Sequence, residues 1–284
     1  MQFFDLKAPH ARYKQEIEDR LQALFARGDY IMGPEVAELE AKLAGYVGVA
    51  HAITVKSGTT ALELALRALG IGPGDEVITS PFSWISAAEA IALVGARPAF
   101  VDIEPRSFNI DVALLEQSIT PRTRALLPVS LFGQMPDLAA INAIADRHGL
   151  AVIEDGAQSF GATQHGQRSG SLTQLGVTSF FPTKPLGCYG DGGALFTSDP
   201  ALASKLRALR AHGAALRGEH TLVGVNGRLD TLQAAILLAK LPHLTAELEE
   251  RRRLAARYSK ALAGFCQPPE SLPGNSHVFA QYTL

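Results

Sequence analysis

Residues 51–80, HAITVKSGTTALELALRALGIGPGDEVITS, decide the predicted fold. A β-branched run, HAITV, comes first, and a second run, DEVITS, closes the stretch. Between them apolar residues recur at i, i+3, i+4 and i+7 from Leu62 to Leu69, which predicts an amphipathic helix that ends at Gly70. A strand, a helix and another strand in this order indicate a parallel sheet with helices on its faces.

The same alternation continues on both sides of this stretch. Amphipathic helices are predicted before it, and strands and helices after it, in the runs YKQEIEDRLQALFAR, GPEVAELEAKLAGYVG, SAAEAIALVG, PAFVDI, DVALLEQSI, TRALLPVS, DLAAINAIADRHG and LAVIED. The runs VTSFF and GALFTSD flank a glycine-rich turn and predict a hairpin, after which helices dominate. A long helical pattern over residues 228–264 contains Pro242, where we expect a kink or break. The predicted fold class is therefore α/β with a mostly parallel central sheet.

Two domains are expected. A large domain with N-terminal helices would span residues 1–240, and residues 241–284 would begin a smaller C-terminal α+β module. The last residues, SHVFAQYTL, alternate in polarity as a strand does. A strand at this place needs a partner, so the smaller module looks truncated.

The composition of the chain argues against several classes of function. The chain has 284 residues, of which 47% are hydrophobic and 19% charged, as in a soluble globular protein with a large core. A net charge of -2 offers no basic field for nucleic acid or an anionic membrane. Cys188 and Cys266 lack metal-ligand spacing, so neither a metal site nor a disulfide framework is expected. No secretory h-region or membrane span is expected either, and we predict a cytoplasmic location.

Ligands of open α/β sheets bind at the carboxyl ends of the strands, so polar residues at these ends are the candidates for a site. The first group lies in TVKSGTTALELAL, where Ser57, Gly58, Thr59 and Thr60 separate a strand from a helix. Backbone N–H groups at a helix N-terminus, together with hydroxyls, form an anion site. The alternative interpretation is a plain N-cap.

The second group lies in LAVIEDGAQSFGA, where a hydrophobic strand ends in Glu154 and Asp155 and Gln158 follows. A carboxylate at a buried strand end must be paired or hydrogen-bonded, because an isolated ionised group would protonate. A cationic group of a ligand would meet this need. A helix cap or a salt bridge to an arginine is the alternative.

The third group is FFPTKPLGCYGDGG, residues 180–193, which contains Lys184. Pro182 and Pro185 fix φ on either side of this lysine and stiffen the backbone before any tertiary contact forms. Taken alone, Lys184 would be interpreted as a surface cation.

Together the three groups offer donors for a phosphate, an acceptor for a ring cation and an amine able to form an imine, which are the handles that pyridoxal phosphate (PLP) requires. Five motifs carry a resemblance to a known family: GTTALELAL, GPGDEVITSPFSW, VIEDGAQSFGA, SFFPTKPLGCYGDGGA and GVNGRLDTLQAA. They resemble the DegT-type PLP-dependent nucleotide-sugar aminotransferases of the aspartate aminotransferase superfamily. This resemblance implies the three-layer transferase architecture known as fold type I.

The resemblance also implies roles for individual residues. Lys184 matches the lysine that forms the Schiff base and moves the proton, and Asp155 matches the residue that keeps the pyridine nitrogen protonated. Gln158 would lie near the phenolic oxygen of the cofactor, and Trp84 would stack on the pyridine ring. Without the resemblance, Trp84 could equally be a core residue.

Contacts to the cofactor phosphate are implied for four residues. Gly58, Thr59 and Ser179 would come from one subunit, and Asn226 would reach over from a second subunit. A homodimer with a shared active site is therefore expected.

The activity that the resemblance implies is amino transfer by a ping-pong mechanism. L-glutamate would convert PLP to pyridoxamine phosphate (PMP), which would then aminate a keto group of a nucleotide-linked sugar. The branch that this sequence most resembles acts on UDP-linked 2-acetamido-3-oxo sugars, including uronic acids, for polysaccharide or O-antigen biosynthesis. The alternatives are a keto-sugar dehydratase, against which Lys184 argues, and a non-catalytic regulator that binds sugar or cofactor.

One further run has two interpretations. EERRRLAARYSK, residues 249–260, is typical of a solvated helix face. Its basic cluster could instead meet a nucleotide diphosphate.

Overall fold

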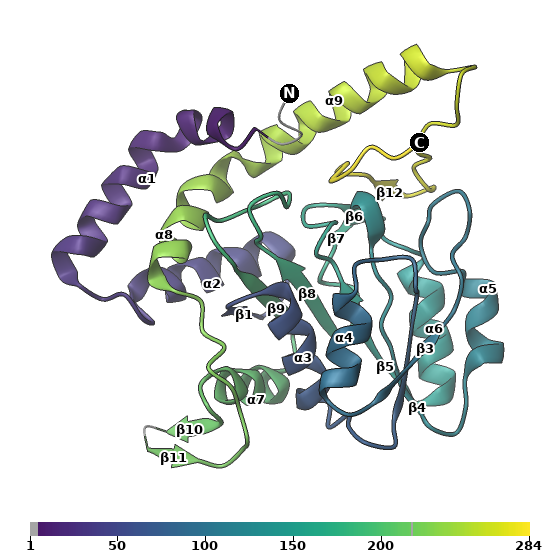
Figure 1. Cartoon of the computed structure of the whole chain (residues 1–284), viewed down its shortest axis with the longest axis horizontal. Helices are drawn as coiled ribbons and strands as arrows, with labels where there is room; N and C mark the ends of the chain where they lie inside the picture. Colours follow the sequence, from purple (N-terminus) through teal and green to yellow (C-terminus); the bar gives the residue numbers. More distant parts are fainter. Residues whose placement is uncertain (1–4, 217) are drawn as a thin grey trace.

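The computed structural model describes residues 5–216 and 218–284. A seven-stranded sheet occupies its centre, in the strand order β1-β9-β8-β5-β4-β2-β3 (Figure 1). The strands of this sheet are β1 (His51–Val55), β2 (Glu76–Thr79), β3 (Arg97–Phe100), β4 (Thr123–Leu126), β5 (Ala151–Asp155), β8 (Leu175–Ser179) and β9 (Gly193–Thr197). β9 runs antiparallel to both of its neighbours, and every other pair in the sheet is parallel. The predicted α/β class with a mostly parallel sheet is confirmed.

Helices cover both faces of this sheet and make three layers. One hydrophobic core joins the sheet to α2 (Pro34–Val47), α5 (Val112–Leu115), α6 (Leu138–His148) and α8 (Thr231–Lys240). A second core, on the other face, joins it to α3 (Gly58–Ala68), α4 (Ser86–Leu93) and α7 (Pro200–Arg210). Successive strand residues alternate between the two cores, as Val152 and Ile153 of β5 do. Side chains at the end of one strand therefore face opposite layers.

Two further helices lie beside this three-layer body. α1 (Lys7–Arg27) packs Tyr13 and Ile17 against Ile236 of α8. α8 ends at Lys240, a short 3-10 helix spans Leu241–His243, and α9 (Leu244–Leu262) continues from there. The break that Pro242 predicts is confirmed. The division into domains at residues 240 and 241 stays a prediction.

The C-terminal segment returns to the body and joins a small sheet. There, β12 (Asn275–Ser276) pairs with β6 (Thr163–Gln164), which also pairs with β7 (Gln167–Arg168). The predicted strand over residues 276–284 is wrong beyond Ser276. Phe279 has a φ of 46°, which interrupts an extended chain, and the N–H of Val278 donates to the carbonyl of Gly133. These last residues bond to the turn at Phe132 and Gly133 and form no strand.

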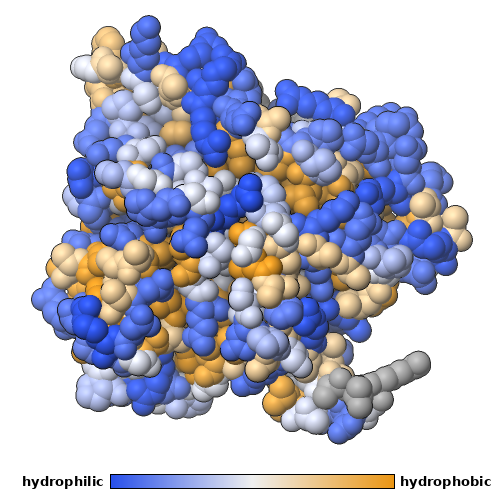
Figure 2. Space-filling model, turned by 180° about the vertical axis from the view of Figure 1, so that it is seen from behind, coloured by the Kyte–Doolittle hydropathy of each residue, from blue (hydrophilic) through white to orange (hydrophobic). Residues whose placement is uncertain are grey.

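The remaining elements are short. They are the 3-10 helices Glu116–Ser118 and Leu131–Gly133 and the hairpin of β10 (Ala214–Leu216) and β11 (Glu219–His220), which projects from the body in Figure 1. Seen from the other side, the surface mixes hydrophilic and apolar residues (Figure 2). Among the described residues no helix has both the length and the hydropathy needed to cross a membrane.

Candidate active site

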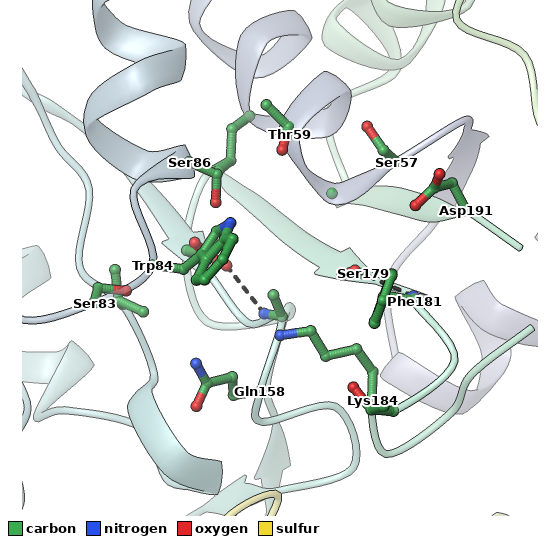
Figure 3. Close-up of a pocket in the computed structure, with 16 residues that line it drawn as sticks. Ser57, Thr59, Ser83, Trp84, Ser86, Gln158, Ser179, Phe181, Lys184 and Asp191 are labelled. Atoms are coloured by element: carbon green, nitrogen blue, oxygen red, sulfur yellow. Dashed lines mark hydrogen bonds between the residues drawn. The ribbon is translucent and has the colours of Figure 1, made fainter. Parts of the chain in front are cut away.

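A cavity of about 400 Å³ opens at the carboxyl ends of β5 and β8, beside the first turn of α3 (Figure 3). Seven of the eight predicted site residues line it, namely Gly58, Thr59, Trp84, Asp155, Gln158, Ser179 and Lys184. The structure thus brings the three groups of polar residues at the strand ends to one place. Their individual roles stay predictions.

Asp155 ends β5 and is buried. Among the residues that the structure describes, its carboxylate accepts one hydrogen bond, from the N–H of Ala157 at 3.0 Å. Burial raises the pKa of Asp155 above its ordinary value, and the charge of Lys184 only partly opposes this shift. Because one hydrogen bond does not satisfy a buried carboxylate, the site favours a ligand that brings a cation or an N–H donor.

Lys184 lies in the turn that joins β8 to β9, and its N–H donates to the carbonyl of Phe181 at 2.9 Å. Figure 3 shows its amine extended into the cavity, on the side of Trp84 and Gln158. Burial lowers the pKa of Lys184, and Asp155 acts in the opposite direction. A lower pKa increases the fraction of neutral amine, which is the nucleophilic form.

The first turn of α3 has the geometry that the predicted anion site requires. Ser57 is its N-cap, because its Oγ accepts the N–H of Thr60 at 3.0 Å, and the N–H groups of Gly58 and Thr59 have no partner within the helix. A Cβ on Gly58 would lie 2.9 Å from the Cβ of Ser179. Glycine is therefore required for α3 and β8 to approach this closely. The N-cap is confirmed, and the anion site at the same turn stays a prediction.

Gln158 and Trp84 bound the cavity on other sides. The Oε1 of Gln158 accepts the N–H of Phe132 at 2.8 Å, and this bond turns the amide nitrogen toward the cavity (Figure 3). Trp84 is 74% exposed. The alternative that Trp84 is a core residue is therefore wrong, and its ring is available to a flat ligand.

Glu154, next to Asp155, is also buried but faces the opposite layer. Its carboxylate accepts hydrogen bonds from Ser130 Oγ at 2.7 Å, Ser169 Oγ at 2.6 Å and the N–H of Gly170 at 2.7 Å. Burial raises its pKa, and the three donors oppose the shift. Glu154 is thus a closed structural group, whereas Asp155 is open to the cavity.

Asn226 does not line the cavity. It is exposed and forms a backbone bridge with Ala211, at the base of the projecting hairpin. Conversely, Phe181, Thr183 and Asp191 line the cavity but were not among the predicted site residues. All three belong to the run around Lys184, so the signal was present in residues 180–193. Among the described residues no group of three metal-ligating side chains comes together.

A buried carboxylate, a desolvated lysine and a helix N-terminus around one cavity define the site of a PLP-dependent enzyme. The chain belongs to the DegT/DnrJ/EryC1/StrS aminotransferase family, whose model matches residues 11–284.

Two relatives illustrate the sequence similarity. A UDP-2-acetamido-2-deoxy-3-oxo-D-glucuronate aminotransferase of Pseudomonas aeruginosa is 52% identical over 100% of this chain and 79% of its own length. A UDP-N-acetyl-3-dehydro-alpha-D-glucosamine 3-aminotransferase of Acidithiobacillus ferrooxidans is 47% identical over 99% of this chain and 76% of its own length.

Two solved structures illustrate the fold. DesV of S. venezuelae, in complex with a ketimine intermediate, has a TM-score of 0.97 and 43% identity, over 99% of this chain and 76% of that one. NtdA of Bacillus subtilis, with bound PMP, has a TM-score of 0.90 and 34% identity, over 95% of this chain and 63% of that one. The predicted transferase fold, the aminotransferase class and the PLP/PMP cofactor are confirmed at the level of the family.

Proposed function

We propose that this protein transfers an amino group from L-glutamate to the keto group of a nucleotide-linked sugar, with a UDP-2-acetamido-3-oxo sugar or its uronate as acceptor. One observation carries the proposal: Lys184, with a lowered pKa, shares a cavity with the open carboxylate of Asp155. The names of the two relatives support the choice of acceptor. A place in polysaccharide or O-antigen biosynthesis and a cytoplasmic location are part of this proposal.

The residues around the cavity fit PLP at both of its ends. Gly58, Thr59 and Ser179 would hold the phosphate at the first turn of α3, where the helix dipole favours an anion. Asp155 would accept the N–H of the pyridine ring, which supplies the partner that its carboxylate lacks. When bound, PLP provides the electron sink for breaking a C–H bond of the substrate.

The other side chains would orient the reactants and move the proton. Lys184, as a neutral amine, would take the proton from the substrate carbon and return it on the other side of the reaction. The amide nitrogen of Gln158 would donate to the phenolic oxygen of the cofactor, since its Oε1 is held by Phe132. Trp84 would cover the flat face of the ring.

A second copy of the chain would complete the site. Two large apolar side chains that line the cavity, Trp84 and Phe181, are exposed. Further exposed apolar side chains of the described surface include Ile31, Met32, Phe82, Ile85 and Val223. Exposed apolar surface of this kind is typical of a subunit interface. In a homodimer that buries it, the exposed Asn226 of one subunit would reach the phosphate end of the other site.

The test is Lys184→Ala in the protein loaded with PLP, offered L-glutamate and then a panel of UDP- and dTDP-linked 3-keto and 4-keto sugars. We expect turnover to fall by several orders of magnitude while the dimer stays folded. Amino transfer is measured by the mass of the product. The matched control is Lys260→Ala, which changes an exposed lysine of α9. Substantial residual turnover in Lys184→Ala would contradict the proposed function, and a monomer would contradict the proposed dimer. The dehydratase alternative is disfavoured because this chain has a lysine, Lys184, at the position that matches the Schiff-base residue.

A further inference from the structure

A second cavity, of about 280 Å³, lies on the other side of Lys184. It opens between the start of α1, the turn that carries Lys184, and α9, and Thr183 and Lys184 line both cavities. Its charged walls comprise the cations Arg12, Lys240 and Arg251 and the carboxylates Asp5, Glu247 and Glu250. A molecule that fills this cavity would therefore touch the residue at which the chemistry is proposed to take place.

Two of the three cations, Lys240 and Arg251, are poorly solvated. Burial lowers the pKa of both Lys240 and Arg251, and Glu247 only partly opposes each shift. Lys240 is held in place, because its Nζ donates to the carbonyl of Gly187. Within the described part of the chain, Arg251 makes no hydrogen bond and no ion pair. A desolvated guanidinium without such a partner is costly unless an anion arrives.

The carboxylates of the cavity have other partners. Both oxygens of Glu250 bond to Arg253, one of them at 2.7 Å from its Nε. Glu247 accepts a hydrogen bond from the hydroxyl of Tyr13, and Asp5 accepts one from the backbone N–H of Lys7 at 2.9 Å. Glu247 acts on Arg251 only through its charge, so what the described part of the cavity lacks is an anion bonded to this guanidinium.

We infer that this second cavity is an anion subsite of the same active site, in which Arg251, with Lys240 beside it, receives the diphosphate or a carboxylate of a substrate. The inference rests on the proposed function, because both proposed substrates carry such groups. A guanidinium presents paired N–H donors that match the oxygens of a phosphate or carboxylate. Arg251 belongs to the basic run 249–260. Its proposed role agrees with the second interpretation of that run, in which the basic residues contact a nucleotide diphosphate.

The first test measures binding without turnover. Pyrophosphate and glutarate, which represent the two kinds of anion, are titrated calorimetrically into the PLP-loaded full chain. We expect one of them to bind the wild type and to bind Arg251→Met about ten- to a hundredfold more weakly. Lys260→Met, which removes an exposed cation of the same helix outside the cavity, is the matched control and should bind as the wild type does.

The second test assigns the anion by following the two half-reactions separately. A raised KM for the keto sugar nucleotide in Arg251→Met, with kcat little changed, identifies the diphosphate, and a raised KM for L-glutamate identifies the carboxylate. If neither KM moves and neither anion distinguishes Arg251→Met from wild type, the inference is overturned. A wild type that binds the anion but does not convert L-glutamate refutes the proposed function instead and leaves the anion site standing.

A third test uses the wild type alone and so does not depend on correct folding of the Arg251→Met variant. Phenylglyoxal modifies accessible arginines, and peptide mass spectrometry reports the labelling of Arg251. We expect the bound anion to protect Arg251 and to leave Arg253 as reactive as before. Equal labelling of Arg251 with and without saturating pyrophosphate or glutarate would overturn the inference.

Discussion

β5 ends in two neighbouring carboxylates, Glu154 and Asp155, which point to opposite faces of the sheet and differ in their hydrogen-bond partners. Glu154 points away from the cavity, to the rear face of the sheet, and accepts three hydrogen bonds from the protein. Asp155 points into the cavity and accepts one from the described residues. Both are buried, and burial raises the pKa of both. The comparison shows that burial alone does not tell whether a carboxylate is open to a ligand. The donors that the protein supplies do, because a ligand can fill only acceptor capacity that the protein leaves unmet.

Between these two carboxylates, the largest effect should come from Asp155→Asn. Asparagine keeps the size of the side chain but removes the charge that would hold the ring nitrogen protonated. We expect kcat/KM to fall by roughly a hundred- to a thousandfold, measured in the glutamate half-reaction. The free energy of unfolding of the apoprotein should stay the same or rise, because a buried carboxylate with one hydrogen bond is costly.

The same change at the neighbouring position, Glu154→Gln, is the control for Asp155→Asn. Its amide oxygen can still accept from Gly170, and the hydroxyls of Ser130 and Ser169 can rotate to accept from the amide nitrogen. If Glu154→Gln lost as much activity as Asp155→Asn, the distinction between the two faces would fail.

An intermediate effect is expected for Glu154→Leu, which leaves the donors of the rear face without an acceptor. We expect the free energy of unfolding to fall by about 2–4 kcal/mol, measured by chemical denaturation of the apoprotein. Glu154→Gln should retain most of the stability. A Glu154→Leu variant as stable as wild type would show that these hydrogen bonds contribute little.

The smallest effect is a pH dependence. In the apoprotein the pKa of Asp155 lies above its ordinary value of 3.8, so between 3.8 and the raised pKa the folded state binds more protons than the unfolded state. Stability therefore falls as the pH rises through this window, by at most about 1.4 kcal/mol per pH unit for one group. Asp155→Asn lacks this proton, so its stability relative to wild type should increase with pH there. Denaturation curves of both apoproteins across the acidic range measure the difference, and parallel curves would contradict the shift.

Much of the fold and of the site follows from local patterns. The alternation of strands and helices predicts the sheet, and the rule that ligands bind at the carboxyl ends of parallel strands brings Asp155, Lys184 and Gly58 into one cavity before any contact is known. Proline and glycine also act locally, which is why the break at Pro242 was predictable.

The rest depends on contacts between distant parts of the chain. The pattern of residues 249–260 predicts a helix face but not what that face meets, because the start of α1 and the turn at Lys184 complete the second cavity. The run 276–284 alternates like a strand, yet a strand forms only where another edge is free to pair. The single hydrogen bond of Asp155, against the three of Glu154, was likewise invisible, since both residues simply end a hydrophobic strand.

The antiparallel pairing of β1 with β9 has a consequence for assembly. α3 directly follows β1, whereas the turn with Lys184 directly precedes β9, so the first turn of α3 and Lys184 meet in the cavity only after this contact of high sequence separation has formed. Such contacts form slowly, because a long loop must close first. If PLP binds as proposed, the appearance of its colour during refolding would therefore report the formation of this slow contact.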